Sequence, residues 1–407
     1  MTTTLADYCS LVSTQVDPRS YTDAIYIGLE HIRSGALRRS GGGLGRDVQS
    51  SKFAFSKNDL LYGKLRPYLD KAILADCDGI CTTELLVLRP KPHVDPRFLA
   101  CAVHSADFIE HAMSGVTGAQ HPRTSWHRIS EFEVPSLTPD EQELMADILW
   151  KIHESLQSNE STLTTLEQLK QATMQGLFKC GLDSEAQKES EIGLIPASWA
   201  IAPLSSIAQI ERGRFLHRPR NEPRFYGGLT PFVQTGDVVR SCGRLTEYTQ
   251  TLNEDGVSIS RVFPKGTILI TIAANIGFTG ILGFDAACPD SLVAITPSKH
   301  LDAAFLEYFL RTQQSEMDRR APKGTQKNIN IQFLNPWPIP VPEMKEQYEI
   351  VGILDAIDQK IDLHKRKKAI LEELFKTLLH KLMTCELQAS ELRLSMLRTA
   401  EEIEAMA

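Results

Sequence analysis

One short stretch of the chain, ERGRFLHRPRNEPRFYGG, is crowded with arginine. It carries Arg212, Arg214, Arg218, Arg220 and Arg224, with aromatic residues among them. A guanidinium binds phosphate through its charge and pairs bidentately with the edge of guanine, while the glycines and prolines of this stretch oppose a helix. The pattern therefore predicts a loop that contacts DNA. The alternative is a solvated loop, or one that covers acidic parts of the chain.

Other polar side chains have the chemistry to read bases. Glutamine and asparagine can pair bidentately with adenine, and lysine and arginine with guanine. Candidates in the first half of the chain are Lys64, Arg66, Tyr68, Gln120 and Arg123. Candidates in the second half are Thr235, Lys323, Gln326, Lys327 and Asn328. A glutamine in a loop is as often merely solvated, so that alternative stays open for this set.

Sequence patterns for catalysis and metal binding are missing. GGGLG at 41–45 fails the G-x-G-x-x-G pattern, and NPWP at 335–338 has the wrong order for the Asn-Pro-Pro-aromatic loop of an adenine methyltransferase. No His-Glu-x-x-His or Walker sequence occurs, and none of the eight cysteines forms C-x-x-C. We interpret Asp290 as a turn residue and Asp140 as a helix N-terminal acid. We therefore expect no catalytic, cofactor-binding or metal site, and no enzyme activity in this chain.

The composition is typical of a globular chain of two or three domains: 407 residues, 42% hydrophobic and 23% charged. No run of 18 apolar residues and no signal-peptide pattern occurs, so we expect a cytoplasmic protein with reduced, buried cysteines. The net charge is −7, but the acidity lies in residues 135–190 and 339–407. The remaining parts are near neutral and can still present a basic face to DNA.

The two acidic segments begin with the same short motif, which consists of a proline-bounded strand end, then Glu-Gln, then the start of a helix. We call this motif the Glu-Gln corner. A shift of 205 residues places Glu141-Gln142 on Glu346-Gln347. Each corner opens a stretch of roughly forty residues whose apolar positions alternate at three and four, the spacing of a helix that packs on another helix. The seam residues are Leu149, Ile152, Leu156, Leu163 and Leu166 in the first helix, and Leu354, Ile357, Ile361, Leu371 and Leu378 in the second.

These seams predict that the two helices pack on each other and offer a docking surface for partners. Asn159 and His364 are polar seam residues at equivalent positions, and such residues often fix the register of a coiled coil. Duplication of a domain followed by a helix implies a pseudo-two-fold axis, which lays the helices antiparallel. The alternative is that each seam packs only on its adjacent domain.

The segments before the two helices also match. FSKNDLLYGKLRPYLDKAILADCDGICTTELLVLRP at 55–90 parallels FPKGTILITIAANIGFTGILGFDAACPDSLVAITP at 263–297, with short apolar strands and a cysteine-bearing turn. The expected fold is α+β: two similar strand-rich domains, each followed by a long helix, with the helices packed as an antiparallel coiled coil. The expected boundaries are 1–137 for the first domain, 138–180 for the central helix, 181–192 for a polar linker, 193–341 for the second domain, 342–385 for the distal helix and 386–407 for a helix-prone tail.

Several of these stretches, taken together, match the sequence motifs of a known protein family. GLIPASWAIAPLSSIAQIERG at 193–213, PFVQTGDV at 231–238, LLYGKLRPYLDKAILADCDGICTTELLVLRP at 60–90 and the two Glu-Gln corners carry the resemblance. Across nearly its whole length the chain resembles the specificity subunit of type I restriction–modification systems. It departs from that pattern in the first domain, which lacks the Ile-Pro-x-x-Trp lead and has GLEHI at 28–32 where the second domain has Thr-Gly-Asp.

The resemblance implies a non-catalytic subunit of a prokaryotic, cytoplasmic phage-defence system. Each strand-rich domain is then a target recognition domain that reads half of a split, asymmetric DNA sequence. The helices separate the halves and dock two copies of an adenine-N6 methyltransferase subunit, which would bind S-adenosylmethionine, and restriction/translocase subunits can join. The alternative is a pseudo-symmetric scaffold that bridges partner subunits without reading DNA.

Overall fold

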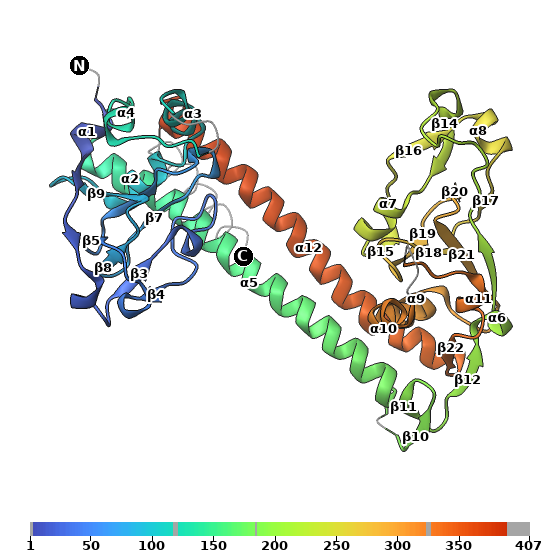
Figure 1. The fold of residues 1–407 in the computed structure, drawn as a ribbon. Helices are drawn as coiled ribbons and strands as arrows, with labels where there is room; N and C mark the ends of the chain where they lie inside the picture. The colour runs from blue at the N-terminus through green and yellow to red at the C-terminus, as the bar shows by residue number, and fades with distance from the viewer. Residues whose placement is uncertain (1–2, 117–120, 184, 323–326, 389–407) are drawn as a thin grey trace, which may run out of the picture. The chain divides into compact units, whose positions relative to one another are not determined.

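The computed structural model describes residues 3–116, 121–183, 185–322 and 327–388 (Figure 1). The chain divides into two compact units: unit 1 is Met1–Thr162 with His364–Ala407, and unit 2 is Leu163–Leu363. Each unit combines a strand-rich domain with parts of two long helices. The expected α+β fold, with two similar strand-rich domains and two long helices, is confirmed. The expected tail from 389 onward lies outside the described residues.

The two long helices are α5 (Pro139–Cys180) and α12 (Met344–Met383). A capping box starts α5, because Glu141 Oε2 accepts from the Thr138 backbone N–H at 2.8 Å and Thr138 Oγ1 accepts from the Glu141 N–H at 3.4 Å. Proline fits the first helical position because that residue has no intrahelical N–H partner to lose. The helix ends at Gly181, whose φ of +67° supplies the left-handed conformation that closes a helix.

The strand-rich domain of unit 1 contains two sheets. The first has the order β1-β9-β6-β7 and the second the order β2-β5-β8-β3-β4, with β3 and β8 parallel. The strands are β1 (Cys9–Val12), β2 (Gln15–Val16), β3 (Ile25–Ile27), β4 (Gly43–Leu44), β5 (Lys52–Phe55), β6 (Leu60–Gly63), β7 (Ala72–Leu74), β8 (Gly79–Cys81) and β9 (Leu85–Pro90). The helices are α1 (Leu5–Tyr8), α2 (Pro96–Ala102), α3 (Ala106–Ser114) and α4 (Trp126–Ser130), with short 3-10 turns η1 (Pro18–Ser20), η2 (Leu29–His31), η3 (Gly45–Asp47) and η4 (Pro67–Leu69).

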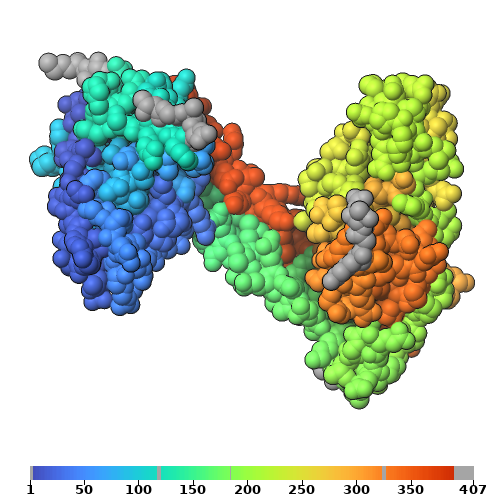
Figure 2. All heavy atoms as spheres, in the orientation of Figure 1, coloured from blue at the N-terminus to red at the C-terminus, as the bar shows by residue number. Residues whose placement is uncertain are grey.

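The domain of unit 2 repeats this layout and extends it. Its strands are β10 (Gln187–Ser190), β11 (Gly193–Pro196), β12 (Ala200–Pro203), β13 (Ala208–Arg212), β14 (Tyr226–Phe232), β15 (Gly243–Leu245), β16 (Gln250–Leu252), β17 (Val262–Phe263), β18 (Ile268–Thr271), β19 (Thr279–Leu282), β20 (Ala286–Ala287), β21 (Leu292–Pro297) and β22 (Pro338–Val341). Its helices are α6 (Leu204–Ile207), α7 (Thr235–Arg240), α8 (Glu254–Ser258), α9 (Ala303–Thr312), α10 (Gln314–Arg320) and α11 (Ile331–Leu334), with η5 (Pro223–Phe225). The β14, β16 and α8 part lies at one end of this domain, away from α9 and α10 (Figures 1 and 2).

The central strand pairings of the two domains correspond. The order β1-β9-β6-β7 in unit 1 becomes β13-β21-β18-β19 in unit 2. The parallel pair β3–β8 becomes the parallel pair β14–β20, and β5–β8 becomes β17–β20. The sequence repeat is therefore a repeat of topology, and GLEHI in the first domain follows β3 just as the segment containing Thr-Gly-Asp follows β14.

The glutamine of each Glu-Gln corner joins the start of a long helix to the domain before it through buried hydrogen bonds. Gln142 is buried, accepts from the Asp95 N–H at 3.1 Å and donates to the Leu137 carbonyl at 3.0 Å. In the second copy Gln347 accepts from the Asp302 N–H at 2.8 Å and donates to the Pro342 carbonyl at 2.9 Å. Because Asp95 and Asp302 cap α2 and α9, each corner ties the start of a long helix to the domain before it. Buried polar groups need such partners.

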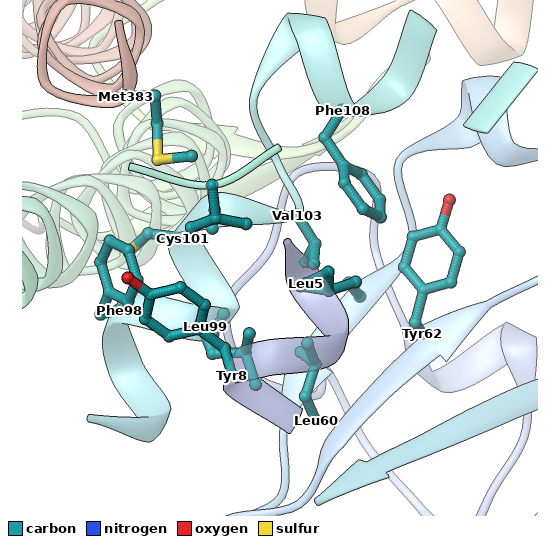
Figure 3. Close-up of a cluster of buried hydrophobic side chains, with 14 of the residues drawn as sticks. Leu5, Tyr8, Leu60, Tyr62, Phe98, Leu99, Cys101, Val103, Phe108 and Met383 are labelled. Atoms are coloured by element: carbon teal, nitrogen blue, oxygen red, sulfur yellow. The ribbon is translucent and has the colours of Figure 1, made fainter. Parts of the chain in front are cut away.

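The core of unit 1 is shared between the strand-rich domain and both long helices. Met145, Leu149 and Trp150 of α5 and Phe375 of α12 belong to the same buried cluster as the domain. Met383 of α12 approaches α2 in this cluster (Figure 3). The two alternatives for the seams are thus combined, because each helix packs on the domain and on the other helix.

Contacts within each unit show that α5 and α12 lie antiparallel. In unit 1 the N-terminal part of α5 packs with the C-terminal part of α12. In unit 2 Met174 and Phe178, late in α5, pack with Ile350 and Leu354, early in α12. All ten predicted seam residues are buried or half-buried. The seam side chains are therefore used within the chain, and a surface for partners must come from other positions of the helices.

The segment predicted as a polar linker contains regular structure. Its residues 187–190 form β10, which pairs antiparallel with β11. Trp199 after this hairpin is buried and donates its Nε1–H to Glu346 at 2.9 Å. The hairpin thus leads the chain back onto the start of α12. Across the described ranges, no helix is long and apolar enough to cross a membrane.

Candidate nucleic-acid interface

Three backbone segments meet at a junction in the domain of unit 1. The Lys64 N–H donates to the Glu84 carbonyl at 3.0 Å, and the Thr124 N–H donates to the Lys64 carbonyl at 3.0 Å. The Arg66 N–H donates to the Pro122 carbonyl at 2.7 Å. This first junction joins the loop after β6, the turn between β8 and β9, and the segment around Arg123. It brings together residues that are about sixty positions apart in the sequence, which no local pattern could do.

The second domain builds the same junction. The Ile272 N–H donates to the Ser291 carbonyl at 3.4 Å, and the Ile329 N–H donates to the Ile272 carbonyl at 2.9 Å. The bridge between Ala273 and Asn328 matches the bridge between Leu65 and Arg123 in the first domain. This second junction therefore joins the loop after β18, the turn between β20 and β21, and the segment around Asn328.

The first junction gathers four of the five predicted residues of its domain. Lys64 and Arg66 are half-buried, whereas Tyr68 and Arg123 are exposed. Arg66 has a φ of +53°, a left-handed conformation that is uncommon for a residue other than glycine and that clusters at functional sites. Gln120 lies outside the described residues. The junction thus brings the cationic residues Lys64, Arg66 and Arg123 together, and a cluster of cations is typical of a DNA-contacting surface.

The second junction gathers Thr235 and Asn328. The hydroxyls of Thr235 and Ser291 lie 3.3 Å apart. Ser291 belongs to the turn between β20 and β21, which the junction joins to the segment around Asn328. Lys327 forms an ion pair with Asp318 at 2.8 Å. Lys323 and Gln326 lie outside the described residues. Asn328 and Arg123 thus hold equivalent places in the two domains, although one is an amide and the other a guanidinium.

The arginine-rich loop is less free than its sequence suggests. Arg218 donates to Asp290 at 2.9 Å, and Arg220 also forms an ion pair with Asp290. Arg212 donates its Nε–H to the Asp290 carbonyl at 2.7 Å. Arg214 donates to the Ser260 carbonyl at 2.8 Å. Three arginines are therefore held at the turn between β20 and β21, although Arg212, Arg214 and Arg218 remain exposed.

Two acids are the residues of this site that sequence reasoning missed. The turn residue Asp290 lies among three arginines, and in the first domain Glu84 accepts from Arg123 Nε at 3.0 Å and Nη2 at 3.3 Å. The available signal was positional, because each acid follows the cysteine of its copy within three residues. Asp290 lies in a turn, as expected, and in addition its carboxylate holds arginines.

The cysteines that open these turns are structural. Cys81 and Cys288 are buried, and burial raises the pKa of each thiol to about 12. A protonated thiol is neither a nucleophile nor a metal ligand. Within the described part of the chain, no group of three His, Cys, Asp or Glu side chains is placed to hold a metal ion.

A polar cleft in unit 2 has its buried carboxylate paired within the protein. It measures about 280 Å³ and is lined by residues between Asp237 and Thr249. The buried carboxylate of Asp237 accepts from the Gln234 N–H at 2.8 Å, from Arg240 at 2.6 Å and from the Thr249 hydroxyl at 3.1 Å. These bonds fix α7 and the loop after β15, so the buried Asp237 carboxylate is used within the protein.

Comparison with known proteins agrees with this fold. The family described as "Type I restriction modification DNA specificity domain" matches residues 196–373. A chain from a type I restriction–modification complex is 20% identical, covers 94% of this chain and 97% of its own, and superposes with a TM-score of 0.60. The type I system S subunit from M. genitalium is 18% identical, with 94% and 96% coverage and a TM-score of 0.62. These structures show that the fold is that of such subunits.

Sequence relatives point to the same class. The MjaIX specificity subunit of Methanocaldococcus jannaschii is 28% identical over 201 residues, which is 46% of this chain and 45% of the relative. The MjaVIII specificity subunit of the same organism is 22% identical over 331 residues, 77% of this chain and 76% of the relative. The first of these matches thus spans about half the length of the relative. The resemblance to type I restriction–modification specificity subunits, inferred from the sequence motifs, is confirmed, and residues 196–373 match the DNA specificity domain family.

Proposed function

We propose that this chain is the DNA-reading subunit of a type I restriction–modification system, with one recognition domain in each unit. The observation that carries the proposal is the duplicated junction. In both domains the same three backbone segments converge, and they carry side chains that bind phosphates and base edges. Because the side chains at equivalent places differ, as Arg123 and Asn328 do, the two domains would read different half-sites of a split, asymmetric target.

The long helices supply the second part of the proposed function, the docking of catalytic subunits. With the seam residues buried in the helix pair, apolar residues remain exposed on the outer faces of α5 and α12. Leu169 is 49% exposed and its equivalent Leu374 is 41% exposed. Exposed apolar side chains on a helix are typical of partner surfaces. Two exposed leucines at equivalent positions of the repeat fit two copies of one adenine-N6 methyltransferase subunit. That subunit would bind S-adenosylmethionine and supply the methylation chemistry, and restriction/translocase subunits could join the complex.

A methylation map of host DNA at base resolution, with and without this chain, tests the proposal. Loss of N6-methyladenine from one split, asymmetric motif on deletion is the expected result. A map that is unchanged while the methyltransferase is expressed and active would contradict it. The alternative is a scaffold that bridges subunits without reading DNA. The ion pairs of Arg218 and Arg220 with Asp290 support this alternative, because they already occupy part of each guanidinium. A salt-dependent gel shift separates the two, because a scaffold would show no preference for any motif.

A further inference from the structure

The carboxylate of Asp290 lies at the centre of the arginine cluster in the second domain. It holds Arg218 at 2.9 Å and pairs with Arg220, while its backbone carbonyl accepts from Arg212 at 2.7 Å. Arg218 also donates to the Phe215 carbonyl at 2.6 Å, and Phe215 is buried. The guanidinium groups are therefore anchored on one side. Each has five N–H donors, so anchoring still leaves donors for a further acceptor.

The first domain has a related acid–arginine contact at its own junction. Glu84 lies in the turn between β8 and β9, as Asp290 lies in the turn between β20 and β21. Its carboxylate holds the Nε and Nη2 edge of Arg123. The backbone of the same residue accepts from Lys64. The repeat places Glu84 on Ser291, so Asp290 lies one residue before the position equivalent to Glu84. Each domain nevertheless has an acid in this turn that holds an arginine of the candidate interface.

An acid at this place has two physical consequences for DNA binding. It fixes an arginine that would otherwise lose side-chain entropy on binding, which favours a contact that needs one geometry, such as the bidentate contact to guanine. It also competes with phosphate for the same guanidinium, which weakens contacts that any DNA sequence can offer. Both effects increase the difference between target and non-target DNA.

We propose that Glu84 and Asp290 are positioning residues for sequence discrimination, one in each domain. Each carboxylate holds arginines in the orientation that reads the half-site and keeps them from binding backbone phosphate indiscriminately. This inference rests on the proposed function of the chain as a DNA reader. It assigns a role to two acids that do not themselves contact DNA.

The test uses the full chain assembled with its methyltransferase and the variants Asp290→Asn and Glu84→Gln. Dissociation constants are measured for target and non-target duplexes over a range of salt concentrations. For non-target DNA we expect the slope of log affinity against log salt to steepen by about two in Asp290→Asn, which releases two arginines, and by about one in Glu84→Gln. The ratio of non-target to target dissociation constants should fall by about tenfold.

Matched controls remove the same charge elsewhere in each domain. Asp255 is exposed on α8 and Glu110 is exposed on α3, and neither holds an arginine in the structure as described. Asp255→Asn and Glu110→Gln should leave the slope and the ratio unchanged. Asp290→Glu keeps a carboxylate and should restore discrimination in part. In a methylation map, Asp290→Asn should relax only one half of the motif and Glu84→Gln only the other half.

The outcomes separate this inference from the function on which it rests. If the wild-type complex discriminates and both variants keep its slope and ratio, the positioning role is refuted and the proposed function stands. If a variant only lowers the melting temperature without changing the ratio, the acid is structural and the positioning role is again refuted. If the wild-type complex itself shows no preference for any sequence, the proposed function fails, and the positioning role fails with it.

Discussion

Asn159 and His364 are equivalent residues of the repeat, 205 positions apart, and they hydrogen-bond to each other in unit 1. Asn159 Nδ2–H donates to the His364 carbonyl at 2.9 Å, and His364 Nδ1 lies 2.6 Å from Asn159 Oδ1. Because that amide oxygen can only accept, the proton of the imidazole is on Nδ1. In unit 2 Lys170 pairs with Asp358. In antiparallel helices a residue later in α5 meets a residue earlier in α12, so Lys170 does not meet its repeat equivalent, Phe375. A polar pair of this kind in an apolar seam specifies register.

Replacing Asn159 by alanine should lower the free energy of unfolding by about 1–3 kcal/mol, because a buried polar partner is lost. His364→Ala should have a related effect, and the double variant should cost less than the sum of the two. Denaturant titration of the full chain measures all three. Ser158→Ala, at the exposed neighbouring position, is the control and should change little. Strictly additive effects would mean that the pair is not coupled.

Replacing Glu307 by glutamine should destabilise unit 2 by about 3 kcal/mol or more. Glu307 is fully buried and accepts from Arg311 at 2.8 Å, from Arg244 at 3.3 Å and from the Thr279 hydroxyl at 2.9 Å. Burial raises the pKa of this carboxyl, but the two guanidinium groups favour its charged form. The neutral amide leaves both arginines without their buried counter-charge. Thermal unfolding should show the loss.

An exposed ion pair provides the control for that variant. Arg38 and Glu154 pair at 3.3 Å, with about half of each side chain exposed. Glu154→Gln should change the stability by less than about 1 kcal/mol, since solvent screens such a pair. Equal effects of the two substitutions would contradict the importance of burial.

Stability should fall as the pH is lowered through the range in which His153 takes up a proton. Burial lowers the pKa of His153 from 6.5 to about 4, and protonation would also break the bond that its Nε2 accepts from the Leu37 N–H at 3.4 Å. The folded-state pKa is depressed, so this contribution is complete above about pH 6.5 and is lost progressively toward pH 4. Between pH 7 and pH 5 the loss is about 2 kcal/mol.

The substitution His153→Gln should remove that part of the pH dependence. Unfolding is measured at pH 7 and at pH 5 for both proteins. His127, which is 91% exposed, supplies the control substitution His127→Gln. A wild-type stability that stays flat between the two pH values would contradict the prediction.

Breaking either long helix should abolish assembly with the methyltransferase. Leu371→Pro or Leu166→Pro places proline in a helix interior, which costs about 3 kcal/mol or more. The milder changes Leu169→Ala and Leu374→Ala affect exposed residues and should weaken docking while leaving the melting temperature nearly unchanged. Size-exclusion chromatography of mixtures detects the complex. Full assembly by the proline variants would refute the role proposed for the helices.

Arg218→Ala and Arg214→Ala should both weaken DNA binding, with different consequences. Loss of a phosphate contact lowers affinity for all sequences and flattens the salt dependence, whereas loss of a base contact relaxes one position of the motif. Arg214 donates to the Ser260 carbonyl and Arg218 to Asp290, so we expect the two variants to differ in salt slope. Unchanged binding by both variants would remove this loop from the interface.

The sequence by itself determined the duplicated architecture. Heptad spacing predicted both long helices because burial of one apolar stripe follows from local periodicity. The shift of 205 residues located the equivalent corners at Gln142 and Gln347, and the motifs pointed to the class of DNA-reading subunits. The heptad pattern is local and the repeat is a comparison of the chain with itself, so one sequence is sufficient to find both.

Only the tertiary structure decided which residues meet. Glu84 and Arg123 are 39 positions apart, and Asp290 and Arg218 are 72 apart, and strand pairing across the sheets brings each pair together. The same holds for Gln142, whose partner Asp95 belongs to a different element. The strand order sets these distances, and no periodicity in the sequence encodes it. The arginines could therefore be found from their type, whereas the acids that hold them could be found only from the fold.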